Sequence, residues 1–424
     1  MSSFTVDAAA ALDGPDWLRA QRVTAAERFV ASGLPSSAEE VWRYSRIDEL
    51  DLDAYSLLAS DAAPGPDAAD VATEDLVPGS IGVLVVDGRV VPGDGAPPDV
   101  AGVEIATVDQ ISEGEGALGS VAGEGPDAFA DLNIAFGPPA LVIRVAPGRT
   151  VDEPIVITHR VTADGAAVFP RVVVQAGNGS GVTVLERYAS SDVHALVCPV
   201  VEIDAARAAR VAYVGIQELG PRVWQVASQV SSVGQEATFL SASAALGGDY
   251  ARLRSDCRLT GRGASGELLA AYFGEAAQTL DFRTFQDHRA PDTTSNLLFK
   301  GAVGGHSRSV YTGLIRVRKE ARGTNAFQTN RNIKLSDHAW AESVPNLEIE
   351  NNDVHCSHAS AVGPVDDEQR FYLESRGVPP RVAERLVVAG FFDEVLTRIP
   401  VPAVLDPLRD RIAGKLDRRE QEIA

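Results

Sequence analysis

The pattern of apolar and polar positions divides the chain into helical ends and a long β-rich middle. From Ala140 to about Val362, short β-branched runs are separated every ten or so positions by turn residues, as in Leu141–Val145, Ile155–Thr158 and Arg171–Gln175. Such runs predict strands. Their number favours a parallel β-helix over a sandwich or barrel, because a solenoid can add rungs indefinitely. No fixed-period repeat is visible, so a strict consensus solenoid is not predicted.

The N-terminal region predicts helices followed by loops. A helical pattern ends at Ser32–Gly33, and Ser36–Glu40 offers two overlapping capping boxes that predict a second helix. From about Ser60 to Pro126 the sequence is rich in Ala, Gly, Pro, Asp and Glu, which is typical of loops and linkers. Within this stretch, Ile81–Val91 predicts a hairpin that turns at Asp87–Gly88.

Three helices are predicted after the strands. They begin near Asp366, Pro379 and Asp406, and the third carries Leu408 and Ile412 on one apolar face. These apolar faces either pack on the end of the solenoid or dock a partner helix or groove. We therefore predict a mainly β protein with helical ends, divided into residues 1–135 (helices, loop-rich linker and small hairpin), 136–364 (β-helix core) and 365–424 (helical domain).

Charge and composition exclude several classes of partner. The net charge of −21 argues against sequence-independent nucleic-acid binding and against an anionic membrane surface. Three cysteines in 424 residues argue against a disulfide-framed secreted domain. The first residues lack the basic and apolar segments of a signal peptide, and no apolar run approaches the roughly 18 residues of a spanning helix. We expect a soluble, cytoplasmic protein.

Candidate metal chemistry is concentrated in Asp353–His358, which holds one of three cysteines and two of seven histidines. In an extended strand, Val354, Cys356 and His358 share one face and His355 takes the other. A thiol and an imidazole supply two ligands to a soft metal or cluster, which is a half-site. The remaining ligands must come from elsewhere in the chain, from water or from another subunit. A structural role for the pair stays open from spacing alone.

Other candidate motifs favour structural roles. The segment Gly301–Gly305 lacks the features of a phosphate loop and predicts a solenoid corner. Glu348 and Glu350 share one strand face, where they could form an acid–base pair but more simply face water. Cys198 and Cys257 are expected to be buried small hydrophobes. The remaining histidines are also expected to be structural, namely His159, His194, His288, His306 and His338.

A set of segments identifies a family resemblance: Gly33–Pro35, Glu40–Tyr44, Lys300–Gly301, Arg308–Gly313, Gln328–Asn332, Pro345–Ile349, Asp353–His358 and Asp367–Gly377. Together they resemble the SufB/SufD family of iron–sulfur cluster assembly. Within that family, the absence of a cysteine between Cys257 and Cys356 favours the SufD-like branch, because SufB-like members carry a ligand cysteine near Gln328–Asn330. The Cys356–Ser357–His358 strand is also similar to SufD-like members.

The resemblance implies a right-handed parallel β-helix between helical regions, and a complex with SufB and two copies of the ATPase SufC. It implies that His358, with Cys356 beside it, faces the SufB interface and helps to assemble a transient iron–sulfur cluster shared with SufB. It also implies SufC docking through the C-terminal helices, for which we predict Phe371, Leu386, Leu408 and Ile412. Flavin participation is left open.

The sequence therefore predicts a non-catalytic scaffold subunit, with the ATPase activity in SufC. Two alternatives remain: a SufB-like, self-sufficient homodimeric scaffold, and a β-helix enzyme that acts on polysaccharide. Such enzymes usually line a groove with aromatic residues and paired acids and usually lack a Cys-Ser-His strand.

Overall fold

The computed structural model describes residues 3–58, 77–91, 100–123 and 125–423. Residues 59–76 and 92–99, which include much of the predicted loop stretch after Ser60, lie outside the described residues. Within the described ranges, no helix is both long and apolar enough to cross a membrane.

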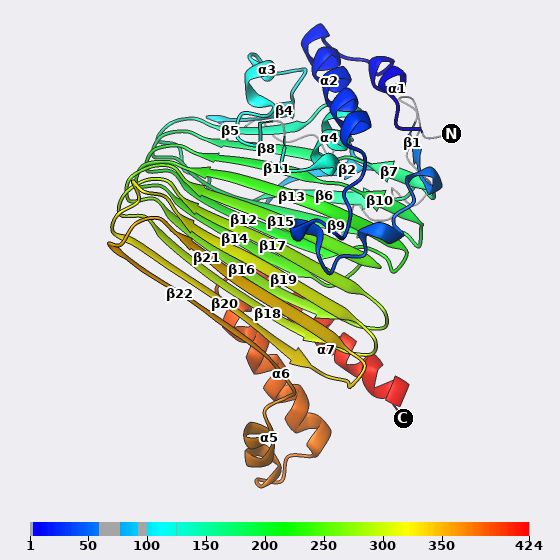
Figure 1. The fold of residues 1–424 in the computed structure, drawn as a ribbon, viewed down its shortest axis with the longest axis vertical. Coiled ribbons are helices and arrows are strands. Elements are labelled where there is room, and N and C mark those ends of the chain that lie inside the picture. The colour runs from blue at the N-terminus through cyan, green and yellow to red at the C-terminus, as the bar shows by residue number, and fades with distance from the viewer. Residues whose placement is uncertain (1–2, 59–76, 92–99, 124, 424) are drawn as a thin grey trace.

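The β-rich middle forms a solenoid of about eight turns, which confirms the predicted β-helix architecture. Its strands alternate between two stacked sheets (Figure 1). The path of sheet A contains β4 (Val103–Thr107), β5 (Leu141–Val145), β8 (Arg171–Ala176), β11 (Val200–Ala205), β13 (Val223–Val233), β15 (Tyr250–Leu259), β17 (Thr279–His288), β19 (Arg308–Val317) and β21 (Trp340–Ile349), and the short strands β1 (Ser56–Leu57), β7 (Ala166–Val168) and β10 (Ala195–Val197) join beside it.

Sheet B contains β3 (Arg89–Val90), β2 (Ile81–Val86), β6 (Ile155–Val161), β9 (Gly181–Ser190), β12 (Arg210–Glu218), β14 (Thr238–Ala245), β16 (Ser265–Gly274), β18 (Thr294–Val303), β20 (Thr324–Lys334) and β22 (Val354–Gly363), in that spatial order. The predicted hairpin is confirmed: β2 and β3 pair antiparallel, and Asp87 and Gly88 both have positive φ, as a tight hairpin turn requires. Through β2 and β4, the N-terminal region extends both sheets.

The repeat of the solenoid lies in its register rather than in its sequence. Tyr250 pairs with Thr279, Thr279 with Arg308, and Arg308 with Trp340, which are separations of 29, 29 and 32 residues. Corner turns of different length absorb these differences. One of them is the predicted corner before β19, where Gly305 has φ 58°.

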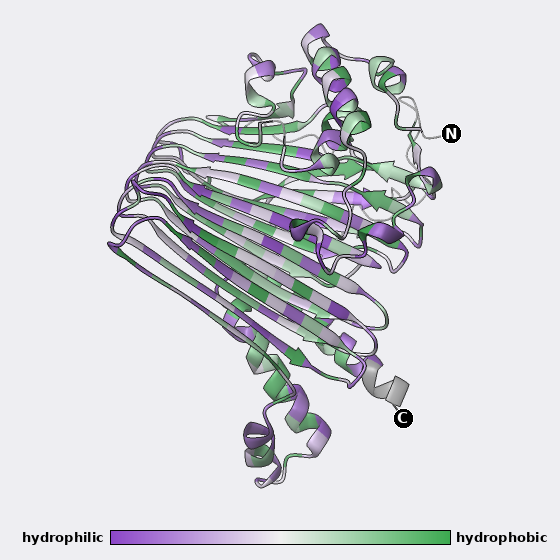
Figure 2. Cartoon of the chain, viewed as in Figure 1, coloured by the Kyte–Doolittle hydropathy of each residue, from purple (hydrophilic) through white to green (hydrophobic). Residues whose placement is uncertain are grey.

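The interior changes character along the solenoid axis. Aliphatic residues such as Ile143 and Val184 fill the space between the sheets near the N-terminal end. Near the other end, polar side chains also enter the interior: Asn330 donates to the Tyr272 hydroxyl at 2.9 Å, this hydroxyl donates to Asn332 Oδ1 at 2.7 Å, and Asn332 donates back to Asn330 at 2.8 Å. Hydrophobic and hydrophilic residues accordingly mix along the strands (Figure 2).

The N-terminal helices pack at the start of the solenoid, and the chain then crosses the outer face of sheet A (Figure 1). The helices are α1 (Val6–Ala10), α2 (Asp16–Ser32), α3 (Gly114–Ala117) and α4 (Ala128–Phe136), with 3₁₀ turns η1 (Glu40–Trp42), η2 (Ile47–Glu49) and η3 (Leu52–Ala54).

The capping boxes of Ser36–Glu40 therefore lead into 3₁₀ turns, not into the predicted α-helix. Trp42 is buried beneath the Arg252 guanidinium, 3.8 Å from its ring centroid. Arg252 also donates to the carbonyl of Val41, and Arg283 to the carbonyl of Arg43. Because these carbonyls bond to sheet A, tertiary contacts override the local helix signal.

The predicted C-terminal helices are present as α5 (Asp367–Glu374), α6 (Pro380–Leu396) and α7 (Leu405–Ile423), with η5 (Pro402–Val404) between the last two. Helix α6 packs on β16 and β18, and Lys300 of β18 donates to the carbonyl of Phe391 at 3.0 Å. The apolar face of α7 is buried in the same core, including Leu408 and Ile412. Helix α5 projects beyond the last strands (Figure 1).

Candidate functional site

Among the residues that the structure describes, the solenoid ends in two strands that are each paired on one side only. Strand β21 pairs with β19, and β22 pairs with β20. The inner faces of these strands are partly uncovered, as the exposed side chains of Leu347, Ile349 and Val362 indicate. An uncovered strand edge presents backbone N–H and C=O groups to which a strand of another chain can add.

Cys356 and His358 lie on the inner face of this last rung, as the strand alternation predicts. In the register, Cys356 lies beside Ala326 and His358 lies beside Gln328, and both β20 residues are buried inside the solenoid. The Cys356 side chain packs with Val354 against a small apolar cluster formed by Ile315, Val317, Ala321 and Ala326. The His358 side chain is exposed. The imidazole is therefore not sealed in the core but is open to a partner.

Protonation of the Cys356 thiol affects its readiness to bind metal. Partial burial raises the pKa of the Cys356 thiol, although a hydrogen bond from the Ala326 backbone opposes this shift. The thiol of the free chain therefore holds its proton at neutral pH, and a metal that binds there must displace it. Within the described ranges, no group of three or more His, Cys, Asp or Glu residues could hold a metal ion. Cys356 and His358 thus form a pair without a third such donor.

Two polar residues of the last strands, one on β20 and one on β21, were not singled out from sequence as site residues. Gln328 is buried, and neither its amide oxygen nor its amide nitrogen has a hydrogen-bond partner in the described part of the chain. The Ser343 hydroxyl on β21 is also buried without a partner there. Gln328 belongs to a segment that carries the family resemblance, but only the register shows that it lies directly beside His358.

Glu348 of β21 and Glu350, just after this strand, are not an acid–base pair facing a cleft. Glu348 accepts two hydrogen bonds from the guanidinium of Arg316 on the neighbouring strand, at 2.6 and 2.8 Å. Glu350 is exposed. This arrangement agrees with the prediction of a solvated strand face.

A groove of about 1050 Å³ separates the end of sheet B from α5 and α6. Its lining includes Lys300, Arg331, Tyr372 and Leu386. On the same helical region, the side chains of Phe371 and Leu386 are 71% and 51% exposed. Leu408 and Ile412, the other two predicted docking residues, instead pack inside the chain, so a partner reaches them only if α7 moves.

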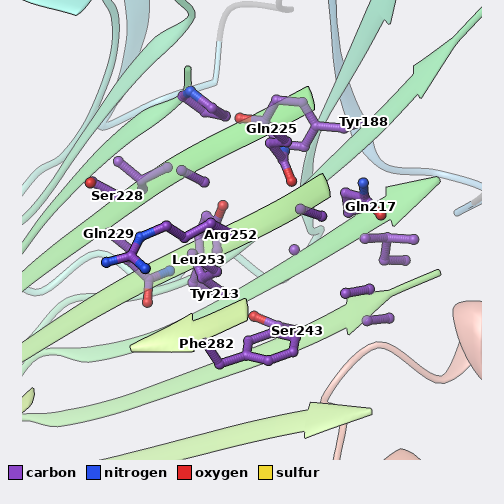
Figure 3. Close-up of a pocket in the computed structure, with 18 residues that line it drawn as sticks. Tyr188, Tyr213, Gln217, Gln225, Ser228, Gln229, Ser243, Arg252, Leu253 and Phe282 are labelled. Atoms are coloured by element: carbon purple, nitrogen blue, oxygen red, sulfur yellow. The ribbon is translucent and has the colours of Figure 1, made fainter. Parts of the chain in front are cut away.

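A second cavity lies inside the solenoid, several rungs from β22. It has a volume of about 60 Å³ and is lined by Tyr213, Gln217, Gln225, Leu253 and Phe282 among others (Figure 3). The lining residues come from strands of both sheets, and Tyr213, Gln217 and Phe282 are among the labelled ones (Figure 3). Its small size leaves room only for molecules about as small as water.

The other cysteines and histidines have structural surroundings, as predicted. Cys198 and Cys257 are buried, and burial raises the pKa of Cys257 to about 12. His288 is buried between the hydroxyls of Thr293 and Ser295, at 2.8 and 2.9 Å. The remaining rings stack: His159 on Tyr188, His194 on Tyr55, and His306 on His338.

Comparison with known proteins gives a consistent result. The family model described as "SUF system FeS cluster assembly, SufBD core domain" matches residues 159–391. An iron–sulfur cluster assembly SufBD family protein of Mycobacterium tuberculosis is 36% identical over 307 residues, which cover 69% of this chain and 74% of that protein. The iron–sulfur cluster assembly protein SufD of Escherichia coli is 26% identical over 397 residues, which cover 92% of this chain and 91% of that protein.

Proposed function

Because the chain belongs to the SufBD family of iron–sulfur cluster assembly proteins, we propose that it is a SufD-like scaffold subunit that contributes half of a cluster-assembly site. One observation carries this proposal. Cys356 and His358 lie together on the inner face of the edge strand β22, which pairs with β20 on one side only, and no third metal-binding residue is grouped with them in the described ranges. Such a pair needs donors from a second chain.

SufB is the partner that this edge would receive. Strands β21 and β22 are each ten residues long, and their free edges can accept strands from a partner through main-chain hydrogen bonds. The exposed Leu347 and Ile349 on the inner face of β21 would then be covered. Pairing at this edge would place the donors of both subunits around one cluster, which is the cargo of the complex.

The chemistry of the two donors suits this cargo. Thiolate sulfur and imidazole nitrogen are both ligands that iron–sulfur centres use. A protonated thiol on the free chain would delay binding until a partner or a metal lowers its pKa. The half-site would therefore act in the complex and hold little metal alone.

We further propose that the helices of residues 365–424 dock SufC. Phe371 and Leu386 are exposed apolar residues on α5 and α6, and Leu386 also borders the groove that α5 and α6 form with sheet B. Lys300 links α6 to β18 through the Phe391 carbonyl and an ion pair with Glu394. A movement of α6 driven by ATP hydrolysis in SufC would thus be transmitted to a strand two positions from β22.

The test is co-purification followed by anaerobic reconstitution with iron and sulfide. When this chain is tagged and expressed with untagged SufB and SufC, both partners are expected in the eluate. The complex should then gain the visible absorbance of a cluster, and the isolated chain should not. A stable cluster on the isolated chain would favour the self-sufficient homodimer and contradict the proposal.

A further inference from the structure

We propose that Gln328 is a positioning residue for His358: when the exposed imidazole turns toward the interior, it donates a ring N–H to the Gln328 amide oxygen, which has no partner in the described part of the chain. This hydrogen bond would fix one tautomer of the ring and leave its other nitrogen directed toward the cargo. The inference rests on the proposed role of His358 as a cluster ligand.

The register places the two side chains next to each other. Gln328 on β20 and His358 on β22 are partners in adjacent parallel strands and point to the same inner face. Adjacent strands lie about 4.8 Å apart, a spacing at which side chains in register can bond. The solenoid contains such bonds: Arg144 donates to its register partner Gln175 at 3.0 Å, and Arg316 to Glu348 at 2.8 Å.

The Gln328 amide is available for this bond. The side chain is 1% exposed, and neither amide atom has a hydrogen-bond partner among the residues that the structure describes. An unpaired buried amide destabilises the fold, and most buried polar groups in proteins are paired. The cost is recovered when the amide oxygen accepts a hydrogen bond from the imidazole of His358, its register partner on the last strand of the sheet.

The opposite sheet makes room for the amide. A Cβ atom at Gly313 would lie 2.5 Å from Gln328 Nε2 and 2.3 Å from the Tyr311 hydroxyl. Glycine at this position therefore lets the amide extend fully into the interior. The amide nitrogen lies toward Gly313 and the Tyr311 hydroxyl, both on β19 of sheet A.

The chemistry of imidazole ligands explains why the amide oxygen is needed. A histidine that binds metal through one nitrogen usually donates its other N–H to an oxygen, which sets the tautomer and the ring orientation. His358 is exposed, so its ring would otherwise rotate between orientations. Gln328 is a neutral acceptor that performs this role without adding a buried charge.

The experiment compares two buried amides. Gln328→Met removes the acceptor and keeps the side-chain volume. Gln286→Met is the matched control, because Gln286 is also 1% exposed with both amide atoms unpartnered in the described chain, but its register partners are Cys257 and Ile315. The full-length chain is labelled with ¹⁵N-histidine, and the ring nitrogen shifts of His358 are assigned with His358→Ala. Zn²⁺ binding that depends on His358 is measured in the same samples.

Gln328→Met should convert the His358 shifts from a single tautomer to a mixture and weaken the His358-dependent Zn²⁺ binding about tenfold. Gln286→Met should change neither, and Gln328→Glu, which retains an acceptor oxygen, should keep the single tautomer. Unchanged shifts in Gln328→Met, or equal changes in Gln286→Met, would overturn the inference. Loss of the single tautomer in Gln328→Glu would also overturn the inference. This variant provides the test if Gln328→Met does not fold. Failure of the proposed function would show separately, as a cluster yield independent of His358.

Discussion

Arg252 and Asp281 form an ion pair of 2.7 Å in which neither side chain is exposed to solvent. Asp281 also accepts hydrogen bonds from the Tyr250 hydroxyl and from Arg283. Burial alone would raise the pKa of Asp281, but the two guanidinium groups hold it below its ordinary value. Because both arginines also bond to backbone carbonyls of residues 41–43, this cluster attaches the N-terminal segment to sheet A.

Asp281→Asn should therefore destabilise the protein strongly, by about 3–5 kcal/mol, since it leaves two buried guanidinium groups without their counter-charge. Denaturant unfolding at pH 7 measures this loss. Asp192→Asn is the control, because Asp192 pairs with Arg222 on the surface and its loss should cost less than about 1 kcal/mol. Equal losses in the two variants would contradict the structural role of the buried cluster.

His288 should make stability fall on mild acidification. Burial lowers its pKa from 6.5 to about 4, and nearby Asp287 only partly opposes this shift. The native state then binds fewer protons than the unfolded state, so the stabilisation is complete above pH 6.5 and is lost as the pH falls toward 4. We expect this group to cost about 2 kcal/mol of unfolding free energy between pH 7 and pH 5.

His288→Gln should reduce that pH dependence by about the same amount, whereas His355→Gln, at an exposed position, should leave it unchanged. Urea unfolding at the two pH values decides between these outcomes. An identical slope in the wild type and in His288→Gln would refute the assignment.

Substitutions in the C-terminal helices should affect SufC docking and folding stability independently. Phe371→Ser and Leu386→Ser remove exposed apolar side chains, so SufC capture should weaken while the melting temperature stays unchanged. Leu408→Ala should instead lower the unfolding free energy by about 2–5 kcal/mol, because it opens a cavity in the core. Val30→Ser, an exposed change on α2, should affect neither. Full SufC capture by the double variant of Phe371 and Leu386 would place the docking surface elsewhere.

The edge strands should become protected when SufB binds. In the isolated chain, β21 and β22 each lack a partner on one side, so part of their amides should exchange rapidly with deuterium. Addition of SufB should slow exchange in residues 340–349 and 354–363. The enclosed strands β13 and β15 serve as the internal reference, with unchanged exchange. Protection confined to other surfaces would contradict pairing at this edge.

Much of the fold followed from local patterns in the sequence. Short β-branched runs predicted the strands, Asp87–Gly88 predicted the hairpin turn, and helix signals at Asp366, Pro379 and Asp406 predicted the last three helices. The alternation of side chains also placed Cys356 and His358 on one face, which the register confirms.

Other features depend on contacts that are distant in the sequence. The segment around Trp42 forms 3₁₀ turns because Arg252 and Arg283, more than two hundred residues away, bond to its carbonyls. Leu408 has the apolar spacing of a docking residue, and only the packing of α7 on the chain shows that it is buried. Gln328 could not be linked to His358 without the strand register, because the two are thirty residues apart.

The central claim is that His358 belongs to a half-site that another subunit completes, and cluster yield tests it most directly. His358→Ala is compared with the wild type in the proposed complex of this chain with SufB and SufC after anaerobic assembly, with iron and acid-labile sulfide counted per complex. We expect His358→Ala to fold and assemble normally, because the side chain is exposed, and to lose most of the cluster. A complex with His358→Ala that holds as much cluster as the wild type would contradict the account.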